Sequence, residues 1–255
     1  MIMIFSQEDD KNIIIARSKS PLLIGIGIDE FLAASDPLAI GKLTNEFIFL
    51  EDEDVAVISN SSIQIYGEKK LPIVREVTEI DSEYQTISKG EYTHFMEKEI
   101  YEQPQAILNT LDGRIGGDDV RDDIFGIGSS KLFEKVKRIQ IVACGTSLHA
   151  GRVAANWLSA IAGIPTQVDY ASEYRYRNPH VDEDSLLVTI SQSGETADTI
   201  AALRYAKEKD YLSTITICIV PTSSLARESD FFLYTNAGPE VGVASTKAFS
   251  TQLTG

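Results

Sequence analysis

The chain has 255 residues, of which 43% are hydrophobic and 24% charged, a composition typical of a soluble globular protein with one large domain or two ordinary ones. Its formal net charge of −15 leaves no electrostatic footprint for nucleic acid or for an anionic membrane, so both partner classes are excluded. No apolar run approaches the roughly 20 residues that span a bilayer. The opening MIMIFSQEDD also lacks the basic start and the cleavage site of a secretory signal.

The N-terminal third predicts a mostly antiparallel sheet. Short β-branched and aromatic runs recur between turn residues, and helical periodicity is scarce. The expected strands are Met1 to Phe5, Asn12 to Ala16, Leu22 to Ile28, Glu46 to Leu50, Val55 to Ser59 and Ile63 to Tyr66. The acidic clusters Glu51 to Asp54 and Asp118 to Asp123 lack the alternation and central glycine of a calcium loop, so we expect solvated loops.

The chain changes character near Lys89. Ser82 to Lys98 reads as a linker that runs into a helix over Glu97 to Leu111, with Pro104 as its start or as a kink. The glycine- and aspartate-rich stretch from Asp112 to Ser130 predicts a loop.

From Val136 onward, buried strands alternate with helices, the pattern of a parallel sheet covered by helices on both faces. The expected strands are Ile139 to Ala143, Gln167 to Tyr170, Leu186 to Ile190, Thr214 to Val220 and Phe231 to Tyr234. A helix over Leu148 to Ile161 is expected to present one apolar face made of Val153, Ala154, Trp157, Leu158 and Ile161. The fold class is therefore α/β, with a doubly wound sheet after a β-rich region.

Two of these strands end in hydroxyl-rich turns that lead into helices. The first turn is Cys144-Gly-Thr-Ser147, and the second is Ser191-Gln-Ser-Gly-Glu-Thr196. Helix N-termini carry unpaired N–H groups and a positive partial charge, and ligands of parallel sheets bind at the carboxyl ends of strands. The pair of turns therefore predicts a site for a small phosphomonoester. The alternative for the second turn alone is an ordinary helix start with Ser193 as its N-cap.

Other chemistry has weaker support. The segment Gly242 to Lys247 also follows a strand, and it is either a third ligand loop or an ordinary helix start. The pattern GxxxxGK[ST] of a nucleotide-triphosphate loop is absent.

Cys144 has no partner placed to activate it, so we expect a packed small side chain rather than a nucleophile. The three histidines, His94, His149 and His180, have no metal-ligand spacing, and no metal site is expected. The two cysteines, Cys144 and Cys218, form no disulfide framework, which fits the cytoplasm.

The motifs resemble those of the isomerising glutamine–fructose-6-phosphate aminotransferase family. CGTS at 144–147, SQSGETADT at 191–199 and EVGVASTKAF at 240–249 are similar to its first sugar-isomerase (SIS) domain. HFMEKEIYEQP at 94–104 is similar to its interdomain segment, and ARSKSPLLIGIGIDEFLAASD at 16–36 to the second half of its glutaminase domain, which has the Ntn-type fold. The resemblance implies three parts: the end of the glutaminase domain at 1–85, a linker and helix at 86–130, and a SIS domain truncated at its C-terminal end at 131–255.

The resemblance also implies function. The family transfers the amino group of glutamine to fructose 6-phosphate, which yields glucosamine 6-phosphate and glutamate without a cofactor, and the intact enzyme is expected to be a homodimer. Phosphate contacts are implied for Ser147, Ser191, Gln192, Ser193 and Thr196, and sugar contacts for Thr146, Val243 and Ser245.

The family hydrolyses glutamine with an N-terminal cysteine, whereas here Ile2 follows Met1 and the first cysteine is Cys144. We therefore expect an internal piece of a longer enzyme that lies outside both catalytic centres and binds only the sugar phosphate. The alternatives are a standalone sugar-phosphate isomerase or deglycase, and a non-catalytic sugar-phosphate sensor. The first would need catalytic residues between Asp112 and Gly255 that the sequence does not reveal, and the second a DNA-binding helical domain, which the acidic β-rich region does not suggest.

Overall fold

The computed structural model describes residues 2–5, 12–18, 20–80, 88–116, 119–121, 123–221, 223–242 and 244–255. The chain divides into two compact units, Met1–Ser88 and Lys89–Gly255, each of which is described by itself. No helix of the described residues is both long and apolar enough to cross a membrane.

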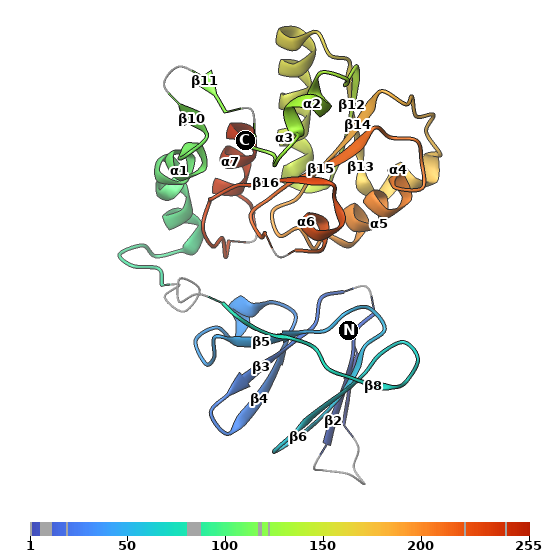
Figure 1. The fold of residues 1–255 in the computed structure, drawn as a ribbon. Coiled ribbons are helices and arrows are strands. Elements are labelled where there is room, and N and C mark those ends of the chain that lie inside the picture. The colour runs from blue at the N-terminus through green and yellow to red at the C-terminus, as the bar shows by residue number, and fades with distance from the viewer. Residues whose placement is uncertain are drawn as a thin grey trace. The chain divides into compact units, whose positions relative to one another are not determined.

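The first unit is built from two antiparallel sheets that share one core (Figure 1). One sheet has the order β1-β2-β6-β7-β8 and the other the order β4-β3-β5-β9. Ile15 and Ile58 from the first sheet pack with Ile24 and Ile48 from the second. The strands are β1 (Ile2–Phe5), β2 (Asn12–Ala16), β3 (Leu23–Gly27), β4 (Glu30–Ala34), β5 (Glu46–Phe49), β6 (Val55–Ser59), β7 (Ile63–Tyr66), β8 (Pro72–Ile73) and β9 (Val77–Glu79), with a 3₁₀ turn at Pro37–Ala39.

The six strands expected in this unit are present, and β4, β8 and β9 were missed because they are short or lack an alternating pattern. The expectation of a solvated loop at Glu51 to Asp54 is wrong for its last residue. The Asp54 side chain is buried, and its two oxygens accept hydrogen bonds from the Arg75 guanidinium at 2.8 and 2.9 Å. A carboxylate leaves water only when it is paired in this way, which a single-sequence pattern does not reveal.

The second unit holds a five-stranded, all-parallel sheet of order β13-β12-β14-β15-β16, and the predicted doubly wound sheet is confirmed (Figure 1). Its strands are β12 (Arg138–Ala143), β13 (Thr166–Tyr170), β14 (Ser185–Ile190), β15 (Ser213–Cys218) and β16 (Phe231–Tyr234). Its helices are α1 (Phe95–Leu111), α2 (Ser129–Phe133), α3 (Gly145–Trp157), α4 (Ala171–Arg177), α5 (Ala197–Ala206), α6 (Ser224–Glu228) and α7 (Lys247–Thr254). A short hairpin of β10 (Ile115–Gly116) and β11 (Asp119–Val120) lies within the segment expected to be a loop.

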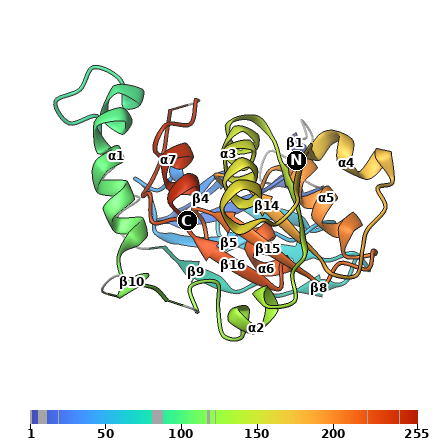
Figure 2. The ribbon, with the colours of Figure 1, turned by 90° about the horizontal axis from the view of Figure 1, so that it is seen from above.

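Alternating side chains of the strands pack into two separate hydrophobic cores, one on each face of the sheet. On β12, Ile141 packs in the cluster that includes Leu148 of α3, whereas Val142 packs in the cluster that includes Tyr174 of α4 and Leu203 of α5. Both faces of the sheet are therefore covered, as the continuous apolar runs of the strands predict. Beyond α3, helix α7 lies between α3 and α1 in both views (Figures 1 and 2).

The expected apolar face of the helix after β12 is partly wrong. Ala154 and Leu158 pack against the core, but Trp157 and Ile161 are 49% and 83% exposed. The α-helix ends at Trp157, and a π-helical turn, Leu158–Ala162, follows it. A continuous period of 3.6 residues does not hold across this change, so the far end of the predicted face turns toward solvent.

Candidate functional site

The two hydroxyl-rich turns lie side by side. Strands β12 and β14 are hydrogen-bonded neighbours, and Ala143 and Ile190, their last residues, are register partners. From β12 the chain crosses to β13 on one side, and from β14 it crosses to β15 on the other, so the two turns flank the point where the strand order reverses. Ligands of open parallel sheets bind in the crevice at this switch point, outside the carboxyl ends of the strands.

The first turn bends sharply into α3. Cys144 is the extended N-cap residue, and Gly145 has φ of 54°, a backbone conformation that favours glycine. Thr146 is half-buried and makes no side-chain hydrogen bond among the described residues. Ser147 is buried, and its hydroxyl accepts a hydrogen bond of 3.0 Å from Nε2 of Gln252 on α7.

The second turn is organised by its own hydroxyl groups. Oγ of the buried Ser191 accepts the Gly194 N–H at 3.0 Å and lies 3.1 Å from Oγ1 of Thr196. Oγ of Ser193 accepts the Glu195 N–H at 3.2 Å. The half-buried Gln192 makes no side-chain hydrogen bond in the described part of the chain, so its amide is available to a ligand.

The N-cap of α5 is Thr196, so the alternative with Ser193 as N-cap of this helix is wrong. The Ser193 hydroxyl accepts the N–H of Glu195, which lies before the helix begins. It therefore binds inside the turn and does not cap an N–H group of α5.

The N-terminus of helix α6 packs against the second turn and restricts its conformation. Gly194 has φ of 69°, and a Cβ added there would lie 2.1 Å from Oγ of Ser223, the N-cap of α6. The two Glu195 oxygens accept the N–H and the hydroxyl of Ser224 at 2.7 and 2.9 Å. Burial raises the pKa of the Cys218 thiol, which lies 3.5 Å from Oγ of Ser223 and stays neutral beneath the turn.

The helix N-termini at this edge of the sheet differ in what fills them. No side chain of the described residues caps α3 or α5, the two helices that begin at the paired turns. In contrast, Glu195 and Ser223 cap α6, and Oε1 of Glu240 accepts the N–H groups of Thr246 and Ala248 at the start of α7, at 2.8 and 3.2 Å. The N-terminus of α4, after the edge strand β13, has no side-chain cap either, but it lies outside the switch point. The two N-termini at the switch point are therefore open to an external anion, whereas those of α6 and α7 already hold a carboxylate or hydroxyl of the chain.

The third element is less suited to an anion. Glu99 of α1 accepts the N–H groups of Val241 and Gly242 at 2.7 and 2.9 Å, and the buried Lys247 forms an ion pair of 2.8 Å with Glu102. The N–H groups of Gly242 and Thr246 and the cation of Lys247 are thus occupied.

Of the two sugar contacts implied for this element, Val243 lies outside the described residues. Ser245 is half-buried, and no hydrogen bond among the described residues joins it to either turn. The placement of both residues at the site stays a prediction.

The remaining candidates show no sign of chemistry. Cys144 is partly buried against the core on the α4 and α5 side, and His94, His149 and His180 are exposed. Among the described residues no group of three or more histidine, cysteine or acidic side chains could hold a metal ion.

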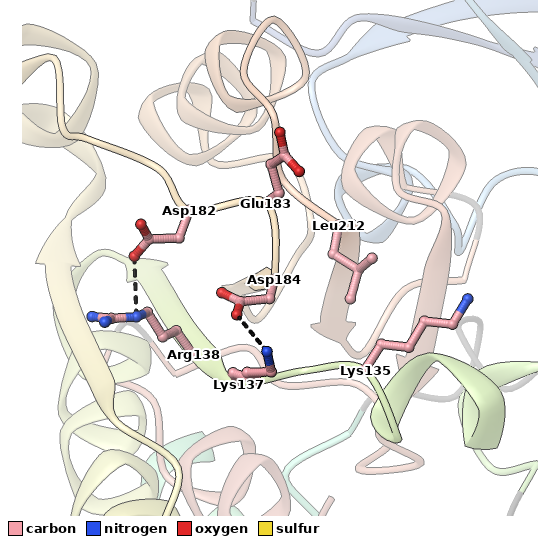
Figure 3. Close-up of a pocket in the computed structure, with 7 residues that line it drawn as sticks. All are labelled: Lys135, Lys137, Arg138, Asp182, Glu183, Asp184 and Leu212. Atoms are coloured by element: carbon pink, nitrogen blue, oxygen red, sulfur yellow. Dashed lines mark ion pairs between the residues drawn. The ribbon is translucent and has the colours of Figure 1, made fainter.

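A hollow of about 590 Å³ lies at the opposite edge of the sheet, where β12, β14 and β15 begin (Figure 3). Four of its charged side chains form ion pairs, since Arg138 contacts Asp182 at 3.0 Å and Lys137 contacts Asp184 at 3.4 Å. The three cations of the lining are balanced by three carboxylates, so the hollow has no excess positive charge that would favour an anion over the two turns.

Sequence reasoning missed the contacts that support these segments. Gln252 binds Ser147 of the first turn, and Glu195 joins the second turn to α6. Glu99 and Glu240 bind N–H groups of the third element and of α7. Glu195 lies inside the quoted motif, but its direction could not be read from the motif. Glu99 and Gln252 contact residues more than 100 positions away in the chain, so no local signal could have found them.

Comparisons with known proteins agree with this geometry. Residues 132–254 match the SIS domain family. The glutamine–fructose-6-phosphate aminotransferase [isomerizing] of Pseudomonas syringae pv. tomato is 56% identical over 238 residues, which are 93% of this chain and 39% of that protein. The protein of the same name from Pseudomonas aeruginosa is 52% identical over 99% of this chain and 41% of its own length.

Among solved structures, the C-terminal domain of glucosamine-fructose-6-phosphate aminotransferase from Francisella tularensis superposes with a TM-score of 0.64 and 52% identity, over 66% of this chain and 47% of that one. The chain spans about two fifths of the length of the curated relatives. The resemblance stated from the motifs is confirmed: residues 132–254 match the SIS domain family, and nearly the whole chain is similar to a segment of the isomerising glutamine–fructose-6-phosphate aminotransferases.

Proposed function

We propose that the second unit binds the phosphate of fructose 6-phosphate or glucosamine 6-phosphate between the turns that follow β12 and β14. The observation that carries the proposal is the pairing of two uncapped helix N-termini at the switch point of the sheet. Ser147, Ser191, Gln192, Ser193 and Thr196 are the proposed phosphate contacts, and Thr146, Val243 and Ser245 the proposed sugar contacts. Hydroxyl groups, an amide and N–H groups together suit a phosphomonoester, because all of them can donate to its oxygens.

We further propose that the protein makes glucosamine 6-phosphate from fructose 6-phosphate and glutamine, the activity that its relatives' names describe. In this proposal residues 1–85 are the end of the glutaminase domain, 86–130 the interdomain segment and 131–255 the first SIS domain. None of the described residues at the two turns is placed for acid–base or nucleophilic work, so this unit contributes binding rather than chemistry.

The two alternatives make different demands on the site. A standalone isomerase or deglycase would need a general base beside the sugar, and neither turn offers one. A sensor would bind the sugar phosphate with the same turns, so it is separated from the aminotransferase by activity and not by binding. The similarity of nearly the whole chain to the aminotransferases favours that enzyme.

Binding of fructose 6-phosphate by the whole chain, measured by calorimetry or by chemical-shift changes, tests the proposal. We expect a dissociation constant nearer millimolar than micromolar, about −4 kcal/mol at the millimolar level, and no detectable binding of fructose. Ser193→Ala and Thr196→Ala should each weaken binding, because a hydrogen bond to a charged group contributes roughly 1.5–3 kcal/mol. The exposed Ser159, in the π-helical turn that follows α3, supplies the control Ser159→Ala. Equal binding of fructose and fructose 6-phosphate would contradict the proposal.

We also propose that the intact protein is a homodimer in the cytoplasm. The exposed Trp157 and Ile161 support association, because large apolar side chains grouped on a surface commonly mark an interface. Sedimentation of the whole chain tests this, and Ile161→Lys should shift the protein toward the monomer. A wild-type monomer at every concentration would contradict the proposal.

A further inference from the structure

Gln252 of helix α7 contacts a residue of the candidate phosphate site. Gln252 of α7 is 5% exposed, and its Nε2 donates to Oγ of Ser147, which is 7% exposed in the first turn of α3. This is the only side-chain hydrogen bond of Gln252 in the described part of the chain, and its buried Oε1 has no partner there. The contact with Ser147 is therefore the one hydrogen bond that this amide makes among the described residues.

The contact decides what the Ser147 hydroxyl can do. A serine hydroxyl has one proton to donate and can accept two hydrogen bonds. The Gln252 N–H occupies an acceptor position, and no described group accepts the Ser147 proton. The proton is consequently left for a ligand. An external phosphate, which offers only acceptors when it is fully ionised, needs this arrangement.

Helix α7 is itself held in place on the side away from Ser147. Lys247 forms its ion pair with Glu102 of α1, and the Ser250 hydroxyl donates to Gln103 of the same helix. These contacts fix α7 against α1, so the Gln252 amide is presented to α3 from a preorganised element.

We propose that Gln252 is a positioning residue that keeps the Ser147 hydroxyl a donor toward the phosphate of the bound sugar. The inference rests on the proposed function, since it assumes that the phosphate lies at this turn. Gln252 acts through Ser147, and its contribution should vanish when the Ser147 hydroxyl is removed.

A double-mutant cycle on the whole chain tests this, with fructose 6-phosphate as the probe. Gln252→Met keeps the length of the side chain but removes both polar groups. In the wild-type background it should weaken binding about three- to tenfold, the range of a typical hydrogen bond. In the Ser147→Ala background it should change binding less than twofold. Gln140 is the matched control, because it is a buried glutamine of β12 that contacts Asp169 and not Ser147, so Gln140→Met should leave the affinity unchanged.

Gln252→Glu adds a pH-dependent readout, and its comparison in the Ser147→Ala background separates loss of the donated hydrogen bond from direct repulsion between the introduced carboxylate and the phosphate. An ionised glutamate can only accept hydrogen bonds, so it would accept one from the Ser147 hydroxyl and leave that hydroxyl no proton to donate to the phosphate. A protonated glutamate can donate to Ser147 as glutamine does. The ratio of wild-type to Gln252→Glu affinity should therefore rise as the pH increases through the pKa of the introduced carboxyl group. A ratio that stays constant with pH would overturn the inference.

The other outcomes separate the two proposals. If Gln252→Met weakens binding equally in both backgrounds, or in neither, while Ser193→Ala still weakens it, the inference fails and the proposed site stands. If the wild-type chain binds no fructose 6-phosphate, both fail. Unfolding curves of each variant identify those that lose affinity through loss of the fold, and for these Gln252→Glu supplies the deciding comparison.

Discussion

Gly194 gives the most demanding test of the geometry of the second turn. Its φ of 69° lies in the left-handed region, and an added Cβ would lie 2.1 Å from Oγ and 2.5 Å from Cβ of Ser223. Gly145 in the first turn has a similar φ of 54°, but an added Cβ would meet no atom within 4 Å. The two glycines therefore separate the cost of backbone conformation from the cost of crowding.

The expected magnitudes follow from these two terms. A left-handed conformation costs about 1 kcal/mol for alanine relative to glycine, so Gly145→Ala should destabilise the second unit by about that amount. Gly194→Ala adds an overlap that the turn or α6 must relieve, and overpacking of this kind costs about 1–3 kcal/mol. The sum for Gly194→Ala is about 2–4 kcal/mol.

Urea unfolding followed by tryptophan fluorescence measures both variants. Trp157 is the single tryptophan of the chain and lies in the second unit, so its signal reports on that unit. The double variant Gly194→Ala/Ser223→Gly should recover most of the crowding cost, because glycine removes both atoms that overlap and lowers the capping energy by only a few tenths of a kcal/mol. Equal destabilisation by Gly145→Ala and Gly194→Ala, or no recovery in the double variant, would refute this reasoning.

Three further predictions concern charged and ionisable groups. Asp54→Asn should destabilise the first unit by about 2–3 kcal/mol in far-UV circular dichroism melts, because it leaves the Arg75 guanidinium without its buried partner; an unchanged melt would contradict it. Burial raises the pKa of Tyr174 and Tyr211 above the ordinary value near 10. The free energy of unfolding should therefore decrease as the pH rises above 10, because these groups ionise more easily in the unfolded chain. Tyr211→Phe should make this decrease smaller in unfolding curves measured at alkaline pH. Glu195→Gln should weaken fructose 6-phosphate binding about threefold, whereas tighter binding would show that charge repulsion outweighs positioning.

Much of the second unit was predictable because its signals are local. The strand Leu186 to Ile190 is a continuous β-branched run, and the helix after it shows a clear period, so both elements and the turn between them follow from the sequence. The two short turns also carry their hydroxyl groups in the motif itself. Their adjacency follows from a general rule of parallel sheets and did not require knowledge of this chain.

What could not be predicted depends on contacts between distant parts of the chain. Ser223 would look like a harmless control from the sequence, because it lies on another loop, yet it packs beneath Gly194. Asp54 looks like part of a solvated acidic run until Arg75 is seen to pair with it across 21 positions. Trp157 and Ile161 have helical spacing but lie where the α-helix gives way to a π-helical turn, and only the structure shows that change.

The placement of the carboxylates explains how so acidic a chain can hold an anion. Glu195, the one charged residue of the two turns, directs its charge to the N-terminus of α6. Glu240 does the same at α7, and Glu99 binds the loop before it. Each of these carboxylates accepts backbone N–H groups outside α3 and α5, so none occupies the open N-termini of these two helices. In the proposed function, selectivity for a phosphate would therefore depend on which helix N-termini the chain leaves unfilled and not on its overall charge, which opposes binding.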